Sequence, residues 1–340
     1  MSHRAYFRWS GFVGLILSIL FSGVNAQVGP SKYPFLSSIQ ALPSLELITE
    51  NSPSEGYIFL SAFNLGVSAE ESHLLIIDNK GEVIQSKSLP FVAIDFHVQP
   101  DGTLSYFDSK KATYTILDSA LNEIRDLPIG TYPFDNHELI VLPGGGYLFI
   151  GEDNYQDDLS KYADTGATDA LVLGKVILEY DAQGNKIFQW RTRDHIPLTE
   201  ATIQNLNNTT VNPYHFNSIE IDHDSNLIIS ARNLDQVFKI HRKTGEFMWR
   251  LGGKKNDFTL IGDSVFFSWQ HCSRILPNGD LILFDNGTNN VVPFSRACEY
   301  SLDTVAKTAT LVRQFRHTPD LLGRLMGSVQ HLPNDNMLIG

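Results

Sequence analysis

The sequence predicts an all-β fold built from a repeated unit of short antiparallel strands. Three observations lead to this prediction. A pattern of strand, tight turn and strand recurs along the chain, helix-like periodicity is scarce, and glycine (25) and proline (15) are frequent among the 340 residues. With 42% hydrophobic residues, the chain is long enough to bury a sizeable core.

The recurring unit is clearest around its central turn, where Pro, Asp, Asn or Gly separates two apolar runs. The turns lie in Gln99-Pro-Asp-Gly-Thr, Leu142-Pro-Gly-Gly-Gly, Asp222-His-Asp-Ser-Asn, Leu276-Pro-Asn-Gly-Asp and Leu332-Pro-Asn-Asp-Asn. Units of roughly 40 to 60 residues, each with about four short strands, predict a β-propeller. Six units are expected over residues 55–340. The sixth stops at Gly340, so a truncated last blade is expected, either in a fragment or in a ring that closes imperfectly.

The N-terminus has the pattern of a secretory signal peptide over residues 1–26. Arg4 and Arg8 precede a short apolar run, and Val24-Asn25-Ala26 offers small residues for cleavage. A retained signal anchor is the alternative, but the run is short for a membrane span. We therefore expect an exported protein, periplasmic or extracellular, without a stable membrane span after cleavage. Residues 27–54 form a lead-in to the propeller.

The formal net charge of −12 argues against a nucleic-acid partner, which requires a basic surface. A small sulfated or phosphorylated substrate remains compatible, because local cations can override the overall charge.

Imidazole and amide side chains occupy equivalent positions of the repeat. His137, Asn217 and His271 each stand ten residues before an apolar residue of the following strand. His215 precedes Asn217 by two residues, and the period of a strand places both on the same face. We therefore expect these side chains to converge at one end of a central channel.

Two further features have open alternatives. The chain contains two cysteines, Cys272 and Cys298, which are either a disulfide or free thiols. Residues 152–174 and 193–212 are long, polar and not strand-like, so they are predicted either to cover the channel mouth or to decorate the surface.

A set of motifs in a fixed order resembles the arylsulfate sulfotransferase family over about residues 130–340. The set comprises His215-Phe-Asn-Ser-Ile, Leu227-Ile-Ile-Ser-Ala-Arg-Asn, Val237-Phe-Lys-Ile-His-Arg-Lys-Thr-Gly-Glu-Phe-Met-Trp-Arg-Leu-Gly-Gly, Trp269-Gln-His and Leu283-Phe-Asp-Asn-Gly. The resemblance implies a six-bladed propeller. It also implies transfer of a sulfuryl group from an aryl sulfate to a phenol through a sulfated histidine, without a nucleotide sulfate donor or other cofactor.

The same resemblance implies roles for individual residues. His271 corresponds to the nucleophile, with His215, Arg232 and His137 as further catalytic residues. Asn217 matches the family's His-x-Asn-Ser element and is expected to bind the substrate. The chain departs from the family pattern after Arg232, where Asn-Leu replaces His-Gln, so fold and site transfer better than substrate identity.

The residue types also suit this chemistry on their own. A neutral imidazole is a competent nucleophile, an arginine can bind sulfuryl oxygens through two donors, and the remaining donors can protonate the leaving oxygen. Trp269 can stack a substrate ring or pack in the core. Three imidazoles also suit a zinc site, but Arg232 opposes a dication, so no metal is expected. The alternative function is a secreted propeller that binds a ligand or partner without catalysis.

Overall fold

The computed structural model describes residues 6–7, 42–43, 45–49, 52–63, 71–202 and 205–340. The predicted signal peptide, apart from residues 6–7, and most of the lead-in segment lie outside the described residues. The described chain is nearly all β, as predicted. Within it, no helix is long and apolar enough to cross a membrane.

The strands form successive antiparallel sheets in chain order. The first contains β3 (Ile58–Phe63), β4 (Ser72–Ile77) and β5 (Val83–Leu89). The second contains β6 (Ala93–Val98), β7 (Leu104–Asp108), β8 (Thr113–Leu117) and β9 (Glu123–Asp126). The third contains β10 (Phe134–Val141), β11 (Tyr147–Glu152), β14 (Lys175–Tyr180) and β15 (Lys186–Arg191).

The later sheets continue the pattern. The fourth contains β17 (Phe216–Ile221), β18 (Leu227–Ala231), β19 (Gln236–Ile240) and β20 (Phe247–Gly252). The fifth contains β22 (His271–Ile275), β23 (Leu281–Asp285), β24 (Arg296–Asp303) and β25 (Thr308–Arg316), with β21 (Thr259–Ile261) added parallel to β25. The pair β26 (Val329–His331) and β27 (Met337–Ile339) follows, and a short pair joins β1 (Tyr6–Phe7) to β2 (Leu47–Thr49).

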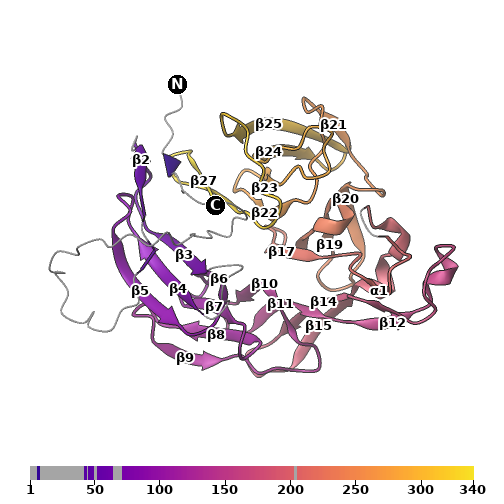
Figure 1. Ribbon diagram of the computed structural model, residues 1–340, viewed down its shortest axis with the longest axis horizontal. Coiled ribbons are helices and arrows are strands. Elements are labelled where there is room, and N and C mark those ends of the chain that lie inside the picture. The colour runs from indigo at the N-terminus through magenta and orange to yellow at the C-terminus, as the bar shows by residue number, and fades with distance from the viewer. Residues whose placement is uncertain (1–5, 8–41, 44, 50–51, 64–70, 203–204) are drawn as a thin grey trace.

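The sheets are arranged around a common centre in a propeller-like manner, with β3, β6, β10, β17 and β22 innermost (Figure 1). Each of these inner strands packs beside the next one. Apolar side chains fill the space between successive sheets. For example, Ile150 and Ile177 of the third sheet share a core cluster with Phe216 and Phe238 of the fourth. Burying such a side chain contributes about 1.5–3 kcal/mol, so each interface between sheets is strongly stabilised.

Two buried glutamines connect neighbouring sheets through main-chain hydrogen bonds. Gln99 donates to Leu139 O and accepts from Val141 N of the next inner strand. Gln270 donates from Nε2 to Ala231 O and Gln236 O of the preceding sheet. The glutamines thereby tie each sheet to its neighbour near the inner strands.

The two long polar segments are structured. They contain a separate small sheet of β12 (Tyr155–Asp157), β13 (Ala170–Val172) and β16 (Thr210–Val211), together with short helices at Leu159–Lys161 (η1), Thr192–His195 (α1) and Leu198–Glu200 (η2). Their buried residues Leu159, Val172 and Leu198 belong to the core cluster between the third and fourth sheets. In Figure 1, β12 extends away from the centre. The segments therefore extend the core of these sheets.

The disulfide alternative is wrong, because Cys272 and Cys298 are free thiols. Cys298 is buried in the core between the fourth and fifth sheets. The Cys272 thiol donates to Val329 O of the neighbouring inner strand at 3.6 Å.

Inner strands are irregular at the end where the candidate site residues lie. The register shifts between Ile94 and His97 in β6, and between Phe216 and Ser218 in β17. Similar shifts occur near the starts of β10 and β22. His215 and Trp269 have φ of 47° and 57°, in the left-handed region that side chains other than glycine rarely adopt. Such bulges re-aim side chains, and here they break the simple alternation of faces.

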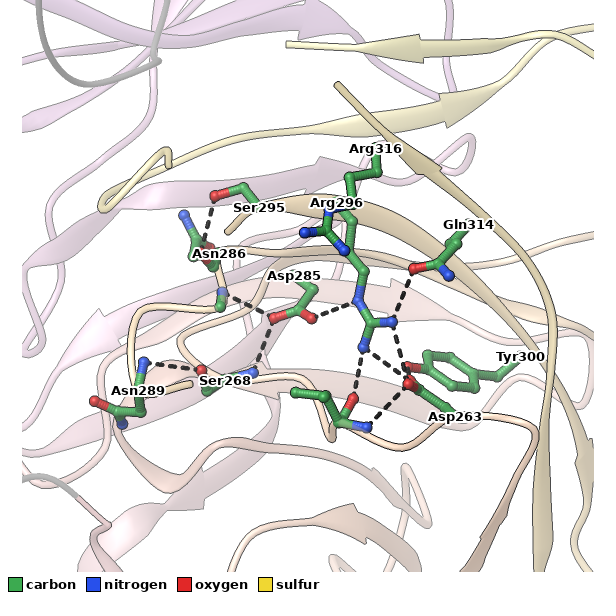
Figure 2. A network of polar contacts seen from close by, with 12 residues as sticks. Asp263, Ser268, Asp285, Asn286, Asn289, Ser295, Arg296, Tyr300, Gln314 and Arg316 are labelled. Carbon is green, nitrogen blue, oxygen red and sulfur yellow. Dashed lines mark hydrogen bonds and ion pairs between the residues drawn. The ribbon is translucent and has the colours of Figure 1, made fainter. Parts of the chain in front are cut away.

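A buried polar network supports the end of the fifth sheet (Figure 2). Arg296 donates from Nε to Asp285 Oδ2 at 2.9 Å and from Nη2 to Asp263 Oδ2 at 2.8 Å. Asp285 Oδ1 in turn accepts from the main-chain nitrogens of Ser268 and Gly287 at 3.0 and 2.9 Å. The network therefore fixes the segments that precede His271 and follow Asn286.

We predict that Arg296→Met destabilises the fold by about 3–5 kcal/mol, because it leaves two buried carboxylates without their cation. Urea denaturation of the purified protein measures this loss. Arg316→Met is the matched control, since Arg316 pairs with Asp320 at the surface of the same sheet, and little change is expected. Equal stability of Arg296→Met and wild type would contradict the assigned role.

Candidate functional site

Three histidines of three successive inner strands meet near the centre of the molecule. His137 lies in β10, His215 immediately precedes β17, and His271 begins β22. The rings of His137 and His215 lie edge to face with centroids 5.0 Å apart. The rings of His215 and His271 are 6.3 Å apart and also nearly perpendicular. The structure thus brings together the three histidines that the repeat pattern singled out, although they are separated by more than a hundred residues in the chain.

The protonated nitrogen of His271 is determined by its surroundings. Asn286 donates from Nδ2 to Gly323 O and Met326 O at 2.7 and 2.8 Å, so its Oδ1 faces His271. His271 Nδ1 lies 2.8 Å from this oxygen and 2.9 Å from Trp269 O. Both partners are acceptors, so Nδ1 carries the proton. In the neutral ring, Nε2 then holds a lone pair, and no described residue donates a hydrogen bond to it.

Asn286 lies at a turn that only glycine can complete. Gly287 has φ of 62°, and a Cβ at this position would lie 2.0 Å from Phe294 O. The Asn-Gly pair in the Leu283-Phe-Asp-Asn-Gly motif therefore has a structural reason: the glycine makes the turn and the asparagine orients His271.

Arg232 supplies positive charge beside these rings. It begins the short helix η3 (Arg232–Leu234), and its guanidinium lies over the ring of Trp269, 4.6 Å from the ring centroid. Its Nε donates to Asn233 Oδ1 at 3.0 Å. Among the described residues, no carboxylate lies within ion-pair distance of Arg232. A half-buried arginine without an anionic partner is suited to binding a sulfuryl or other oxyanion.

His137 has a different environment, because a carboxylate holds its ring. Its Nδ1 lies 2.5 Å from Asp135 Oδ1, and the same oxygen accepts the main-chain N–H of His137 at 2.9 Å. The other oxygen of Asp135 accepts from the ammonium of Lys175, which also donates to Glu152.

Burial shifts the pKa values of His271, His215 and Arg232. It lowers the pKa of His271 to about 3. Burial also lowers the pKa of His215 far below its usual range, helped by the neighbouring His137 and Arg232. Burial lowers the pKa of the Arg232 guanidinium to about 10. At neutral pH the site therefore combines two neutral imidazoles with a cationic arginine.

His215 is the opposite tautomer from His271, with its proton on Nε2 instead of Nδ1. Asn212 Nδ2 lies 3.3 Å from His215 Nδ1, so Nδ1 accepts and the proton of the neutral ring lies on Nε2. The pair therefore offers one lone pair, on His271, and one N–H donor, on His215.

Asn217 and Trp269, predicted as substrate-binding residues, lie at the edge of this group. Asn217 is buried and donates from Nδ2 to Gln270 O at 2.8 Å, which holds the main chain next to His271. The register of β17 shifts at Asn217, between Phe216 and Ser218. Trp269 is half-buried under Arg232, with its main-chain N–H bound to Asp235.

A second charged cluster lies further along the inner strands. Asp95, His97 and Glu138 place ligand-type atoms within 4.8 Å of one another. The cluster does not suit a metal ion, because the Gln99 amide donates to His97 Nε2 and so leaves the proton on Nδ1, 3.1 Å from Asp95. Arg274 also pairs with Glu138 at 2.7 Å. The cluster is an internal ion network.

Sequence reasoning missed three residues that orient the histidines: Asn286, Asp135 and Lys175. A signal was present for two of them. Asp135 stands two residues before His137 in Asp-Asn-His, and Asn286 belongs to a motif already singled out. Lys175 gave none, since it lies forty residues from its partner Asp135.

Comparison with known proteins adds to this geometry. The family model described as arylsulfotransferase (ASST) matches residues 101–340. No curated protein gives a significant match. A crystal structure of a protein of unknown function from Bacteroides caccae is similar at 14% identity, with a TM-score of 0.41, covering 72% of this chain and 69% of that one.

Two further solved structures are similar to a comparable degree. The β-propeller domain of Cps50 (Swd1) from Myceliophteria thermophila has 10% identity and a TM-score of 0.41, covering 77% of this chain and 68% of its own. A protein from Lactobacillus plantarum has 14% identity and a TM-score of 0.40, covering 80% and 73%. The family match spans more than half of the sequence and contains all the histidines and the arginine of the site, so the chain belongs to the arylsulfotransferase family.

Proposed function

We propose that this protein transfers a sulfuryl group from an aryl sulfate to a phenolic acceptor through a sulfated His271, without a nucleotide sulfate donor, on a six-bladed propeller in an exported protein. The tautomer of His271 is the observation that carries this proposal. Asn286 and Trp269 O hold the proton on Nδ1, so Nε2 is available as a nucleophile.

In the first half-reaction, His271 Nε2 attacks the sulfur and the bond from sulfur to the aryl oxygen breaks. The electron pair goes to the aryl oxygen, which takes a proton and leaves as a phenol. Arg232 and the N–H of His215 bind the sulfuryl oxygens, whose negative charge they match. The Nδ1–H of the sulfated ring stays hydrogen-bonded to Asn286 Oδ1, which stabilises the positive charge that the ring acquires.

In the second half-reaction, the acceptor phenol loses its proton and its oxygen attacks the sulfur. The bond from sulfur to Nε2 breaks, and its electron pair returns to His271. The two halves use the same groups in opposite directions, so ping-pong kinetics are expected.

We predict that brief incubation with 4-nitrophenyl sulfate and no acceptor increases the intact mass by about 80 Da, the mass of one SO₃ group, because the histidine is sulfated before turnover. Intact-mass spectrometry measures the gain. His271→Ala should show none. His223→Ala, which changes an exposed turn histidine, should gain mass as wild type does. If folded wild-type protein gains no mass, the alternative of a non-catalytic ligand-binding propeller is favoured.

Asn286→Ala tests the orientation of the nucleophile. We expect the rate of mass gain to fall about 10- to 100-fold, because His271 loses the acceptor that fixes its tautomer. Asn278→Ala, in an exposed turn of the same sheet, is the control and should leave the rate unchanged. An unchanged rate in a folded Asn286→Ala variant would show that Trp269 O alone orients the ring.

The pH dependence of mass gain should reflect the buried nucleophile. Since burial lowers the pKa of His271 to about 3, this ring remains neutral and reactive at pH 5. A histidine with an ordinary pKa near 6.5 would lose about 25-fold in its neutral fraction between pH 7 and pH 5. We predict no such fall for the single-turnover rate, with circular dichroism confirming the fold at each pH. A 25-fold decline would contradict the assignment.

A further inference from the structure

Asp135 is a buried carboxylate beside His137, and it has no role in the reaction steps given above. It stands near the start of β10, two residues before His137, and only 4% of it is exposed. Its Oδ1 receives two N–H groups of the same histidine, one from the ring at 2.5 Å and one from the main chain at 2.9 Å. The ring of His137 therefore has little freedom to rotate.

Other strands of the same sheet keep Asp135 ionised. The ammonium of Lys175, at the start of β14, donates to Asp135 Oδ2 and to Glu152 at the end of β11. Glu152 and Lys175 lie directly opposite each other in the β11–β14 pair, which places their side chains side by side. Burial opposes the charge, but His137 and Lys175 hold the pKa of Asp135 well below its usual range.

The surroundings of the three histidines therefore differ in one respect. His271 Nδ1 has the neutral partners Asn286 Oδ1 and Trp269 O, and His215 Nδ1 has the neutral partner Asn212. His137 alone of the three has a carboxylate on Nδ1. A carboxylate stabilises an imidazolium and fixes the proton of the neutral ring on Nδ1, which leaves Nε2 to give or accept a proton.

The charged groups around His137 are consistent with a different role for this ring than for His215 and His271. The ring of His215 contacts the ring of His137 edge to face. The charge of Arg232 lowers the pKa of both His215 and His271. Arg232 alone would disfavour a second positive charge at this place. Asp135 offsets that repulsion, while Lys175 is compensated by Glu152.

We propose that Asp135 is a positioning residue that makes His137 the proton donor and acceptor of sulfuryl transfer. This inference rests on the proposed function and assigns one proton path within it. When the bond between sulfur and aryl oxygen breaks, the Nε2 proton of the His137 imidazolium passes to that oxygen, and His137 becomes neutral. In the second half, the acceptor phenol returns a proton to Nε2, and the phenolate oxygen attacks the sulfur.

Donors with different leaving groups test this assignment. A good leaving group such as 4-nitrophenolate departs with little help, whereas the phenolate of phenyl sulfate depends on protonation. In Asp135→Asn, we expect the single-turnover rate of mass gain to fall about 100-fold with phenyl sulfate and less than about fivefold with 4-nitrophenyl sulfate. In a His137→Gln background, Asp135→Asn should cause no further loss, because it acts through the histidine.

Asp153→Asn is the matched control. Asp153 is equally buried, but it pairs with Arg193 and not with a histidine. Its effect, whatever its size, should be the same for both donors. If Asp135→Asn does not fold, Asp135→Glu keeps the charge for Lys175 and displaces the carboxylate by one methylene, and it should show the same selectivity between donors.

The outcomes separate the two proposals. Selective loss with phenyl sulfate supports the role of Asp135. Equal losses with both donors, in a wild type that does gain mass, overturn the role of Asp135 and leave the proposed function intact. Wild-type protein that gains no mass from either donor overturns both.

Discussion

One buried hydrogen bond, from His271 Nδ1 to Asn286 Oδ1, determines what the central histidine can do. The asparagine cannot turn its amide around, because its nitrogen is bound to two carbonyl oxygens. The histidine therefore keeps its proton on Nδ1. This contact depends on the loops around it, and the ion network of Asp285, Arg296 and Asp263 fixes those loops from behind. A buried ion pair of this kind costs desolvation energy, but it orients several backbone segments at once.

Under the proposed function, the site also shows how an acidic chain can bind an anion. The formal charge is −12, yet His271 and His215 are neutral imidazoles beside the cationic Arg232. Two carboxylates of the neighbouring inner strand β10 are paired with other cations. Asp135 is bound by His137 and Lys175, and Glu138 is bound by Arg274. Arg232, beside the histidines, has no ion pair with a described residue, and Trp269 shields one face of its guanidinium from water.

Under the proposed function, the geometry separates three tasks that an isolated histidine could not perform together. One ring needs a lone pair, another needs an N–H donor, and a third needs a proton that it can lose and regain. The partners on Nδ1 differ accordingly: an amide oxygen with a carbonyl for His271, an amide nitrogen for His215 and a carboxylate for His137. In the second cluster, Arg274 pairs with both Glu138 and Glu220.

The sequence by itself determined the β class, the repeated strand unit and the candidate histidines, because turn residues and strand periodicity are local properties. Arg232 came from the family resemblance of its motif. It could not determine the side-chain directions. Bulges shift the register at the ends of the inner strands, and Asn217, which lies at one of them, donates to the main chain beside His271. It also could not reveal the partners. Asn286 reaches His271 from the turn after β23, and Lys175 reaches Asp135 across forty residues. Only the tertiary structure decided the tautomers and charges, since these depend on burial and on groups brought together from distant parts of the chain.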